Sequence, residues 1–387
     1  MHEIKTLNKI AAVGLDQLSK SKYHVSEDCT CPEAILVRSA KMHDYVFNPE
    51  LLCIARAGAG TNNIPVEQCA EKGIVVFNTP GANAMAVKEL AICAMLLASR
   101  DIVGGINWVK GLAGQENIPA QVEKGKSAFV GPELWGKSLG VIGLGAIGAK
   151  IANDASHLGM TVYGYDPYLS VEGAWHLSRK VIHSTDVDEV FAKCDYITLH
   201  IPCIDATRGF INADSIAKMK DGVRILNLAR GELVNDDDMI AALEAGKIAR
   251  YVTDFPNAKM VACDKVIAIP HLGASTPESE DNCAVMAAQE AADYIENGNI
   301  VNAVNMPRAV MPRNGDPRLC VIHKNVPDMI AKITGALSAQ GVNIENMVNA
   351  GLKNKPYAYT MIDMDSCPAD LEQRMAAISG VIRVRVI

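Results

Sequence analysis

The chain lacks long apolar runs and long runs of like charge. Its longest apolar stretch, LAICAMLLA at 90–98, is about half as long as a membrane-spanning helix of about 20 residues. No five consecutive residues carry charge of one sign, and the net charge is only -7. Such a surface does not favour nucleic acid or a membrane as partner, so we expect a small-molecule partner.

Paired cysteines and a signal peptide are also missing. Eleven cysteines are scattered along the chain without the C-x-x-C spacing of a zinc site or redox centre. The first residues, MHEIKTLNKIAAVG, have no apolar core of the kind found in secretory signals. We therefore expect reduced thiols, no metal site and a cytoplasmic protein. The apolar stretch at 90–98 then predicts a helix that is buried on both faces.

Short strand-like runs alternate with helical segments along most of the chain. One series lies at 34–39, 51–58 and 74–80, and a second extends from SLGVIGLG at 138–145 to KVIAIPHLG at 265–273. Continuous apolar strands separated by helices predict parallel sheets covered by helices on both faces. The sequence thus predicts an α/β protein with two doubly wound domains of the Rossmann or flavodoxin-like kind.

The C-terminal segment follows a different pattern. After the proline-rich stretch PRAVMPRNGDPR at 307–318, the order is strand, helix, strand, strand, helix, strand. This βαββαβ order is typical of a small ferredoxin-like domain. The domains expected from these patterns are a substrate domain (1–85 with 286–308), a dinucleotide domain (86–285), a linker (309–317) and the C-terminal domain (318–387).

A glycine motif predicts a dinucleotide site. Gly143-x-Gly145-x-x-Gly148 stands where a buried strand gives way to a helical run, and Asp166 ends the next strand. The glycines permit a tight turn, close approach of a pyrophosphate and close packing of helix on strand. A carboxylate at Asp166 accepts hydrogen bonds from a ribose diol but repels a 2′-phosphate, so NAD is favoured over NADP.

Two further residues are candidates for the chemistry. Arg230 ends the strand in RILNLARGELV, and His271 ends the strand in KVIAIPHLG. The carboxyl ends of parallel strands share one edge of a sheet, where a guanidinium can bind a carboxylate and an imidazole can accept a proton. Taken alone, Arg230 could equally pair with a neighbouring acid such as Glu232, and a lone histidine after a strand is more often structural.

These motifs together identify a family. The glycine motif, LNLARGELV, TDF and IPHLGAST resemble the D-isomer-specific 2-hydroxyacid dehydrogenases over about 34–305, and RAGAGTNNI and VFNTPGANAMAVKEL resemble further family blocks. The C-terminal segment is similar to an ACT regulatory domain. This combination implies NAD-dependent oxidation of 3-phosphoglycerate to 3-phosphohydroxypyruvate, the first step of the phosphorylated route to serine.

The resemblance assigns roles residue by residue. It makes Arg230 the clamp on the substrate carboxylate and carbonyl, and His271 the acid/base. The positions implied for the cofactor are Gly143, Gly145, Ala146, Ile147, Gly148, Asp166, Ile201, Pro202, Leu228, Ala229, Asp254, Gly273 and Ala274. Those implied for the substrate are Arg38, Lys41, Arg56, Ala57 and Gly58.

One family feature is missing. A glutamate that usually pairs with the histidine should follow Asp254-Phe255, yet no glutamate stands between 245 and 277. Three explanations are open. In the first, another residue supplies the carboxylate, and Asp264, Glu278 and Glu280 are nearest in sequence. In the second, Lys259 acts as a second base if burial lowers its pKa. In the third, the protein is a cofactor-binding relative with weak catalysis.

The C-terminal segment carries a possible effector site. The resemblance implies that His323, Asn325 and Asn343 bind L-serine between paired domains, although Pro327-Asp328 replaces the usual Pro-Gly. The alternative is a dimerisation domain without a ligand, and we expect a homodimer or homotetramer. Rival functions are a dehydrogenase for glycerate, glyoxylate or 2-oxoglutarate, and an NAD-sensing regulatory protein.

Overall fold

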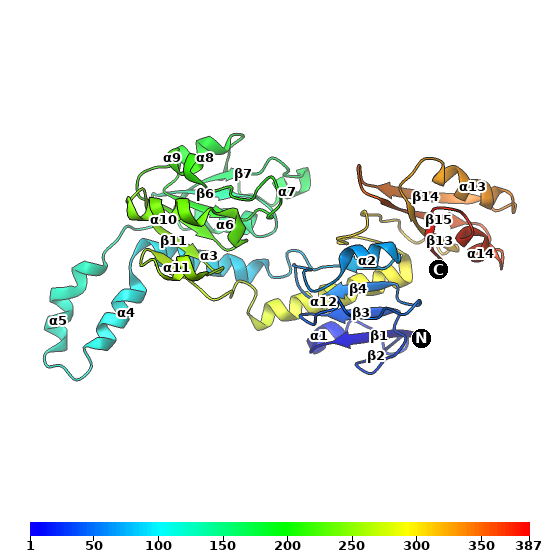
Figure 1. Cartoon of the computed structure of the whole chain (residues 1–387), viewed down its shortest axis with the longest axis horizontal. Coiled ribbons are helices and arrows are strands. Elements are labelled where there is room, and N and C mark those ends of the chain that lie inside the picture. The colour runs from blue at the N-terminus through cyan, green and yellow to red at the C-terminus, as the bar shows by residue number, and fades with distance from the viewer. The chain divides into compact units, whose positions relative to one another are not determined.

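The chain forms two compact units in a computed structural model that describes residues 1–387. Unit 1 comprises Met1–Asn83 and Pro277–Ile387, and unit 2 comprises Ala84–Thr276. In Figure 1, unit 2 holds the elements from α3 to β12, and unit 1 holds all the others. The α/β class, with parallel sheets and a small separate sheet at the C-terminus, is confirmed.

Unit 1 contains a parallel five-stranded sheet with the order β2-β1-β3-β4-β5. The strands are β1 His2–Leu7, β2 Tyr23–Ser26, β3 Ala34–Val37, β4 Cys53–Arg56 and β5 Val75–Phe77, with helices α1 Ala12–Leu15 and α2 Val66–Glu71. The long helix α12, Pro277–Asn297, packs on β3, β4 and β5. Half of its eight buried residues are alanine, namely Ala284, Ala287, Ala288 and Ala291, and such small side chains let a helix lie close to a sheet.

The C-terminal segment of unit 1 forms an antiparallel sheet with the order β14-β15-β13-β16. Its elements are β13 Arg318–Lys324, α13 Met329–Ser338, β14 Ile344–Gly351, β15 Tyr357–Met364, α14 Leu371–Ala376 and β16 Val381–Val386. Leu319 and Val321 face a core built with α13 and α14, whereas Cys320 and Ile322 belong to the core that contains α12. Because strand side chains alternate, β13 is buried on both faces and shares a core with the rest of unit 1.

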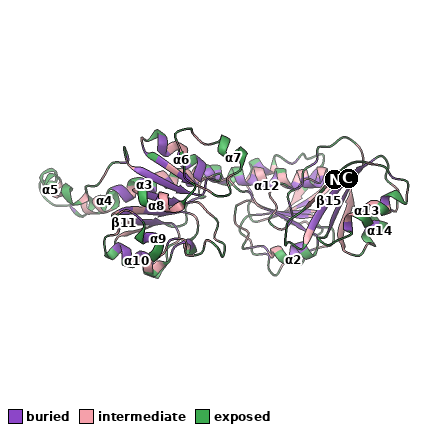
Figure 2. Cartoon of the chain, turned by 90° about the horizontal axis from the view of Figure 1, so that it is seen from above, coloured by how far each residue is buried: buried purple, intermediate pink, exposed green.

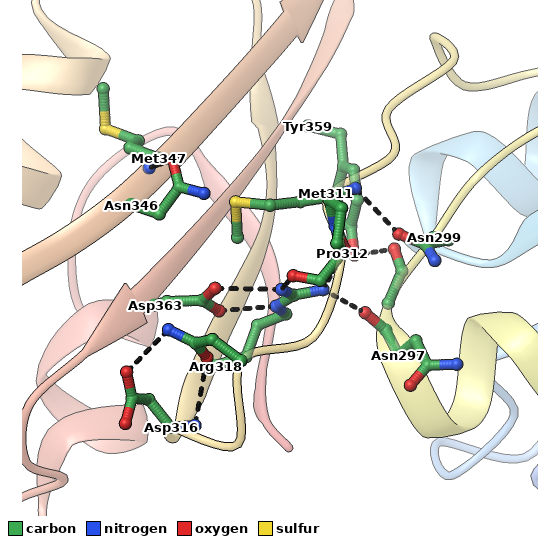
Figure 3. Close-up of polar contacts among 12 residues, drawn as sticks. Asn297, Asn299, Met311, Pro312, Asp316, Arg318, Asn346, Met347, Tyr359 and Asp363 are labelled. Carbon is green, nitrogen blue, oxygen red and sulfur yellow. Dashed lines mark hydrogen bonds and ion pairs between the residues drawn. The ribbon is translucent and has the colours of Figure 1, made fainter.

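A buried arginine fixes the segment that leads into this sheet (Figure 3). The Arg318 side chain is fully buried, and it donates to both Asp363 carboxylate oxygens at 2.6 and 2.9 Å. Its other N–H groups donate to the carbonyl oxygens of Asn297, Met311 and Pro312 at 2.9, 2.7 and 2.7 Å. Five charge-assisted bonds thus join β13, β15, the end of α12 and the proline-rich stretch.

Unit 2 contains a parallel seven-stranded sheet with the order β12-β11-β10-β9-β6-β7-β8. The strands are β6 Ser138–Ile142, β7 Thr161–Tyr165, β8 Ile182–His183, β9 Tyr196–Leu199, β10 Val223–Asn227, β11 Ile248–Thr253 and β12 Val266–Ala268. Two separate apolar clusters contain strand residues of this sheet, as expected of a sheet covered by helices on both faces. Figure 2 shows the strands in the buried colour and the outer helix faces exposed.

The helices around this sheet are α3 Ala84–Ser99, α6 Gly148–His157, α8 Val187–Lys193, α9 Ala213–Ala217 and α10 Asp236–Glu244, with short helices α7 Val171–Trp175 and α11 Ala258–Val261. The prediction that the apolar stretch at 90–98 is buried on both faces was wrong. Only one face of α3 is buried, including Ala91, Ala94, Met95 and Ala98, while Leu96 is exposed. No helix in the structure is both long and apolar enough to span a membrane.

Helices α4 Ile102–Gly111 and α5 Ile118–Gly125 have no buried residue. Figure 1 shows them extending away from the sheet of unit 2. Large apolar side chains on α4, including Ile102, Ile106 and Val109, are consequently exposed.

The Arg318–Asp363 pair generates a test of stability. Replacing Asp363 with asparagine leaves a buried guanidinium without its counter-charge, so we expect unfolding to become easier by about 3–5 kcal/mol. The matched control is Asp370→Asn, which removes a carboxylate from the exposed ion pair with Arg374 and should cost less than about 1 kcal/mol. Chemical denaturation measures both, and equal losses would contradict the assignment.

Candidate active site

The candidate residues of unit 2 lie at the carboxyl edge of its sheet. The glycine turn follows β6, Asp166 follows β7, Ile201 and Pro202 follow β9, Arg230 follows β10, Asp254 follows β11 and His271 follows β12. All these strands are parallel, so their carboxyl ends are at one edge. Strands β7 and β9 flank β6 on opposite sides, so the strand order changes direction there, and ligands of open α/β sheets bind at such a switch point.

The three motif glycines have three different steric environments. Gly143 has φ 92°, and a Cβ there would lie 2.5 Å from the carbonyl oxygen of His200. A Cβ at Gly148 would lie 1.9 Å from the carbonyl oxygen of Gly143, so the helix packs directly on the turn. Gly145, in contrast, has nothing within 4 Å of its Cβ position. The open space at Gly145 leaves the backbone accessible to a pyrophosphate.

The helix that follows the turn is uncapped. The N-cap residue of α6, Ile147, offers no side-chain acceptor to the first N–H groups of the helix. These groups and the helix dipole favour an anion at this position. The turn therefore fits the pyrophosphate of a dinucleotide.

Asp166 is held in place by backbone N–H groups. Its two oxygens accept from Leu144 N and Tyr168 N, each at 2.9 Å. A carboxylate oxygen has a second lone pair, so Asp166 can still accept a bond from a ribose hydroxyl. This geometry fits NAD better than NADP, whose 2′-phosphate would meet a fixed negative charge.

His200 lies beside the turn, and we did not single it out from the sequence. Burial lowers the pKa of His200 to about 3, so its ring is neutral at physiological pH, and Nε2 lies 2.8 Å from Thr198 Oγ1. The sequence feature that could have pointed to His200 is its place between the end of a strand and Ile201-Pro202. Its carbonyl limits the space at Gly143, which makes it part of the turn's structure.

The structure brings Arg230 and His271 together around Phe255. The His271 ring lies 4.6 Å from the Phe255 ring, centroid to centroid, with the planes inclined by 55°. The Arg230 guanidinium carbon lies 6.0 Å from the same Phe255 centroid, and Nη1 donates to Ala229 O at 2.6 Å. Both side chains are exposed and so accessible to a substrate.

Asp254 is the buried acid of this group, with only 1% of its surface exposed. Burial raises the pKa of Asp254, while the positive charges of His271 and Arg230 and a hydrogen bond from the Gly273 backbone oppose the shift. Its Oδ1 has no hydrogen-bond partner. A buried carboxylate with an unused acceptor is costly, and such groups are concentrated at functional sites.

The condition under which Lys259 would serve as a base is not met. The Lys259 side chain is 57% exposed and pairs with Asp237 at 2.5 Å. This ion pair raises the pKa of Lys259, which is the opposite of what a base requires. We therefore leave Lys259 out of the candidate site.

One of the three carboxylates nearest to His271 in sequence lies away from it, and the other two belong to the other unit. Asp264 precedes β12 whereas His271 follows it, so the two residues lie at opposite ends of that strand. Glu278 and Glu280 belong to α12 in unit 1, and Glu280 pairs with Arg38.

The expected substrate residues all belong to unit 1. Arg56 is folded onto the turn that follows β4: its Nε donates to Arg38 O at 3.0 Å, and Nη1 donates to Gly60 O. A Cβ at Gly58, whose φ is 155°, would lie 2.8 Å from Arg56 Nη1. Lys41 is exposed, and Ala57 N donates to Val37 O at 2.8 Å.

The expected effector residues are at two different ends of the C-terminal sheet. Asn325 follows β13 and donates to the carbonyls of Leu352 and Lys355. Buried His323 is near that end, with Nδ1 2.8 Å from Lys324 O and Nε2 2.9 Å from Thr360 Oγ1. Asn343 precedes β14 and donates to Glu345. Because β13 and β14 both pair antiparallel with β15, they run in the same direction, and Asn343 is at the opposite end.

Comparisons with known proteins identify relatives over both units. The family described as D-isomer specific 2-hydroxyacid dehydrogenase, NAD binding domain, matches residues 92–273. D-3-phosphoglycerate dehydrogenase of Haemophilus influenzae is 32% identical over 88% of this chain and 82% of its own length. The enzyme of the same name from Bacillus subtilis is 35% identical over 71% of this chain and 52% of its own length. The chain thus spans about half the length of some curated relatives.

A solved structure of an enzyme with a similar name also matches this chain. NAD+-bound 3-phosphoglycerate dehydrogenase of Entamoeba histolytica matches with a TM-score of 0.60 and 27% sequence identity. The match covers 79% of this chain and 98% of that chain. The glycine turn and Asp166 described above therefore belong to an NAD-binding domain.

The glycine turn generates a paired test. In Gly145→Ala the new methyl meets no protein atom, so we expect an unchanged melting temperature but an affinity for NADH at least about tenfold lower, because the methyl occupies the pyrophosphate's space. Gly148→Ala places a methyl against the Gly143 carbonyl and should lower the melting temperature. NADH fluorescence titration and thermal melting measure the two effects. Unchanged NADH affinity in Gly145→Ala would contradict the cofactor assignment.

Proposed function

The chain belongs to the D-isomer-specific 2-hydroxyacid dehydrogenase family, and we propose that it oxidises 3-phosphoglycerate to 3-phosphohydroxypyruvate in the phosphorylated route to serine. The observation that carries this proposal is the grouping of Arg230, His271 and Asp254 at the sheet edge that also holds the glycine turn. The names of the curated relatives support the choice of substrate.

The cofactor is held by residues at the ends of several strands. NAD+, when bound, supplies a hydride acceptor. We assign its pyrophosphate to the glycine turn with Ala146 and Ile147, and its adenosine ribose to Asp166. The remaining contacts are assigned to Ile201, Pro202, Leu228, Ala229, Asp254, Gly273 and Ala274.

The chain's own residues supply the proton transfer and the charge. In the oxidation direction, the His271 imidazole accepts the proton of the C2 hydroxyl. The Arg230 guanidinium binds the substrate carboxylate through parallel hydrogen bonds and stabilises the negative charge that develops on the C2 oxygen.

In unit 1 we assign contact with the phosphorylated end of the substrate to Arg38, Lys41, Arg56, Ala57 and Gly58. A phosphate dianion is bound best by charged donors, so the two arginines carry most of this proposal. Arg38 would then exchange its ion pair with Glu280 for one with the phosphate.

The same ion pair supports a second candidate function. If Arg38 remains paired with Glu280, the preferred substrate is an unphosphorylated acid such as glycerate, glyoxylate or 2-oxoglutarate. An NAD-sensing protein without turnover is disfavoured, because the accessible Arg230 and His271 would then have no role.

We also propose regulation by L-serine and assembly into a homodimer or homotetramer. His323 and Asn325 are near one end of the C-terminal sheet and Asn343 is at the other, so a site built from all three requires two copies of this domain. A cytoplasmic location fits the eleven cysteines, all of which are free thiols.

The first test is turnover. We expect the protein to oxidise NADH in the presence of 3-phosphohydroxypyruvate, at a higher kcat/KM than with hydroxypyruvate, glyoxylate or 2-oxoglutarate, as followed by NADH absorbance. His271→Ala should lose about 10²–10⁴-fold in kcat because the proton donor is gone, and Lys259→Ala should stay within about threefold of the parent. A higher kcat/KM for an unphosphorylated acid would favour the second candidate.

The second test is serine binding. Calorimetry on the full chain should detect binding of L-serine but not of D-serine. Both Asn325→Ala and Asn343→Ala should reduce the heat of L-serine binding, because each removes one part of the proposed site. The full chain is required, since the C-terminal sheet shares a core with the rest of unit 1. The absence of heat with L-serine at millimolar concentration would contradict the effector proposal.

A further inference from the structure

The carboxyl edge of the unit 1 sheet carries a group of charged residues. Arg38 follows β3, Arg56 ends β4, and Glu280 lies in the first turn of α12, which packs on both strands. The Arg38 guanidinium donates from Nη2 to Glu280 Oε1. Burial raises the pKa of the thiol of Cys283, about one turn further along α12, and the charges of all three residues act on that thiol. The three charged groups therefore lie near one another at this face of the helix.

The turn that bears Arg38 is held by hydrogen bonds to its backbone. Asn8 Oδ1 accepts from the N–H groups of Ser39 and Ala40 at 3.2 and 2.5 Å. Arg56 Nε donates to the Arg38 carbonyl oxygen at 3.0 Å. Because the backbone is held in this way, Arg38 can change its partner by a rotation of its side chain, without a movement of the turn.

The ion pair between Arg38 and Glu280 is exposed to water. The two side chains are 45% and 43% exposed, respectively. Exposed ion pairs contribute little to stability, because water solvates both charges and both side chains lose conformational freedom when they pair. The pair also uses one Nη2 N–H, whereas a guanidinium has five N–H donors. An anion of higher charge can therefore take the place of Glu280 on Arg38.

The end group of the substrate determines whether this exchange takes place. A phosphate dianion has two negative charges and three acceptor oxygens, so it competes well with a single carboxylate for a guanidinium. The end of an unphosphorylated hydroxy acid, such as a hydroxyl group, has no charge and does not compete. In that case Glu280 stays on Arg38, and the guanidinium keeps a counter-charge with either class of substrate.

We propose that Glu280 is a specificity-determining residue: it is the internal anion that a phosphorylated substrate displaces from Arg38 and that stays in place for an unphosphorylated one. Glu280 thereby weakens the binding of phosphorylated acids and leaves that of unphosphorylated acids unchanged, which narrows the selectivity between the two classes. The inference rests on the proposed function, and in particular on the contact between Arg38 and the phosphorylated end of the substrate.

The first experiment compares the parent with Glu280→Gln, which removes the charge and keeps the size of the side chain. We expect KM for 3-phosphohydroxypyruvate to fall by about two- to fivefold, the range of an exposed ion pair, and KM for hydroxypyruvate to stay the same. The kcat should not change, because the phosphate is bound equally in the ground state and the transition state. A higher KM for the phosphorylated acid, or an equal fall for both acids, would overturn the inference.

The matched control is Glu296→Gln, the same change near the other end of α12. Its carboxylate pairs with Lys22 in unit 1, about 24 Å from Glu280 along the helix, so neither KM should change. A fall equal to that in Glu280→Gln would show an effect of net charge and overturn the inference. In an Arg38→Ala background, Glu280→Gln should no longer alter kcat/KM, because the partner is absent.

Binding without turnover separates this inference from the proposed function. Calorimetry on the full chain with NAD+ should show a Kd for 3-phosphoglycerate about two- to fivefold lower in Glu280→Gln than in the parent, and the same Kd for D-glycerate in both. That result without turnover would remove the proposed reaction and keep the role of Glu280. Turnover with an unchanged Kd and KM in the variant would keep the reaction and remove that role. A parent that binds neither acid would overturn both.

Discussion

The parallel pairing of the seven strands in unit 2 is the constraint on which the candidate site depends. Residues far apart in the sequence meet because each directly follows a strand, and parallel strands end at one edge. The close contact between Gly143 and Gly148 then places the start of α6 at this edge. A larger residue at either glycine would separate the helix from the sheet and remove the anion site.

Burial affects which titratable groups are charged at the carboxyl edge of the unit 2 sheet. Asp254 is buried and His200 is half-buried, and loss of hydration favours the neutral form of each. The two side chains differ in the groups that surround them. His200 faces a hydroxyl and stays neutral, whereas Asp254 faces the positive charges of His271 and Arg230, which favour its ionised form. Burial thus leaves the His200 imidazole neutral, whereas opposing effects of burial and of positive charge act on the Asp254 carboxyl group.

Much of the fold and part of the site could be predicted from the sequence. Apolar strand runs, the glycine spacing and Asp166 are local patterns, so they indicated the parallel sheets and the cofactor turn. Contacts between distant residues carry no such local signal. The Arg318–Asp363 pair, the Arg38–Glu280 pair and the position of Asp254 beside Gly273 became visible only in three dimensions. The burial of α3 was misjudged because an apolar sequence does not reveal which of its faces is covered.

Under the proposed function, NAD+ would take up the C2 hydrogen of the substrate as hydride, while the His271 imidazole accepts the hydroxyl proton. The most direct measurement uses 3-phosphoglycerate that carries deuterium at C2, with mass spectrometry of the reduced cofactor. The account predicts NADH that contains one deuterium from the parent protein, at a rate strongly reduced in His271→Ala. Reduced cofactor without deuterium, or an unchanged rate in that variant, would contradict it.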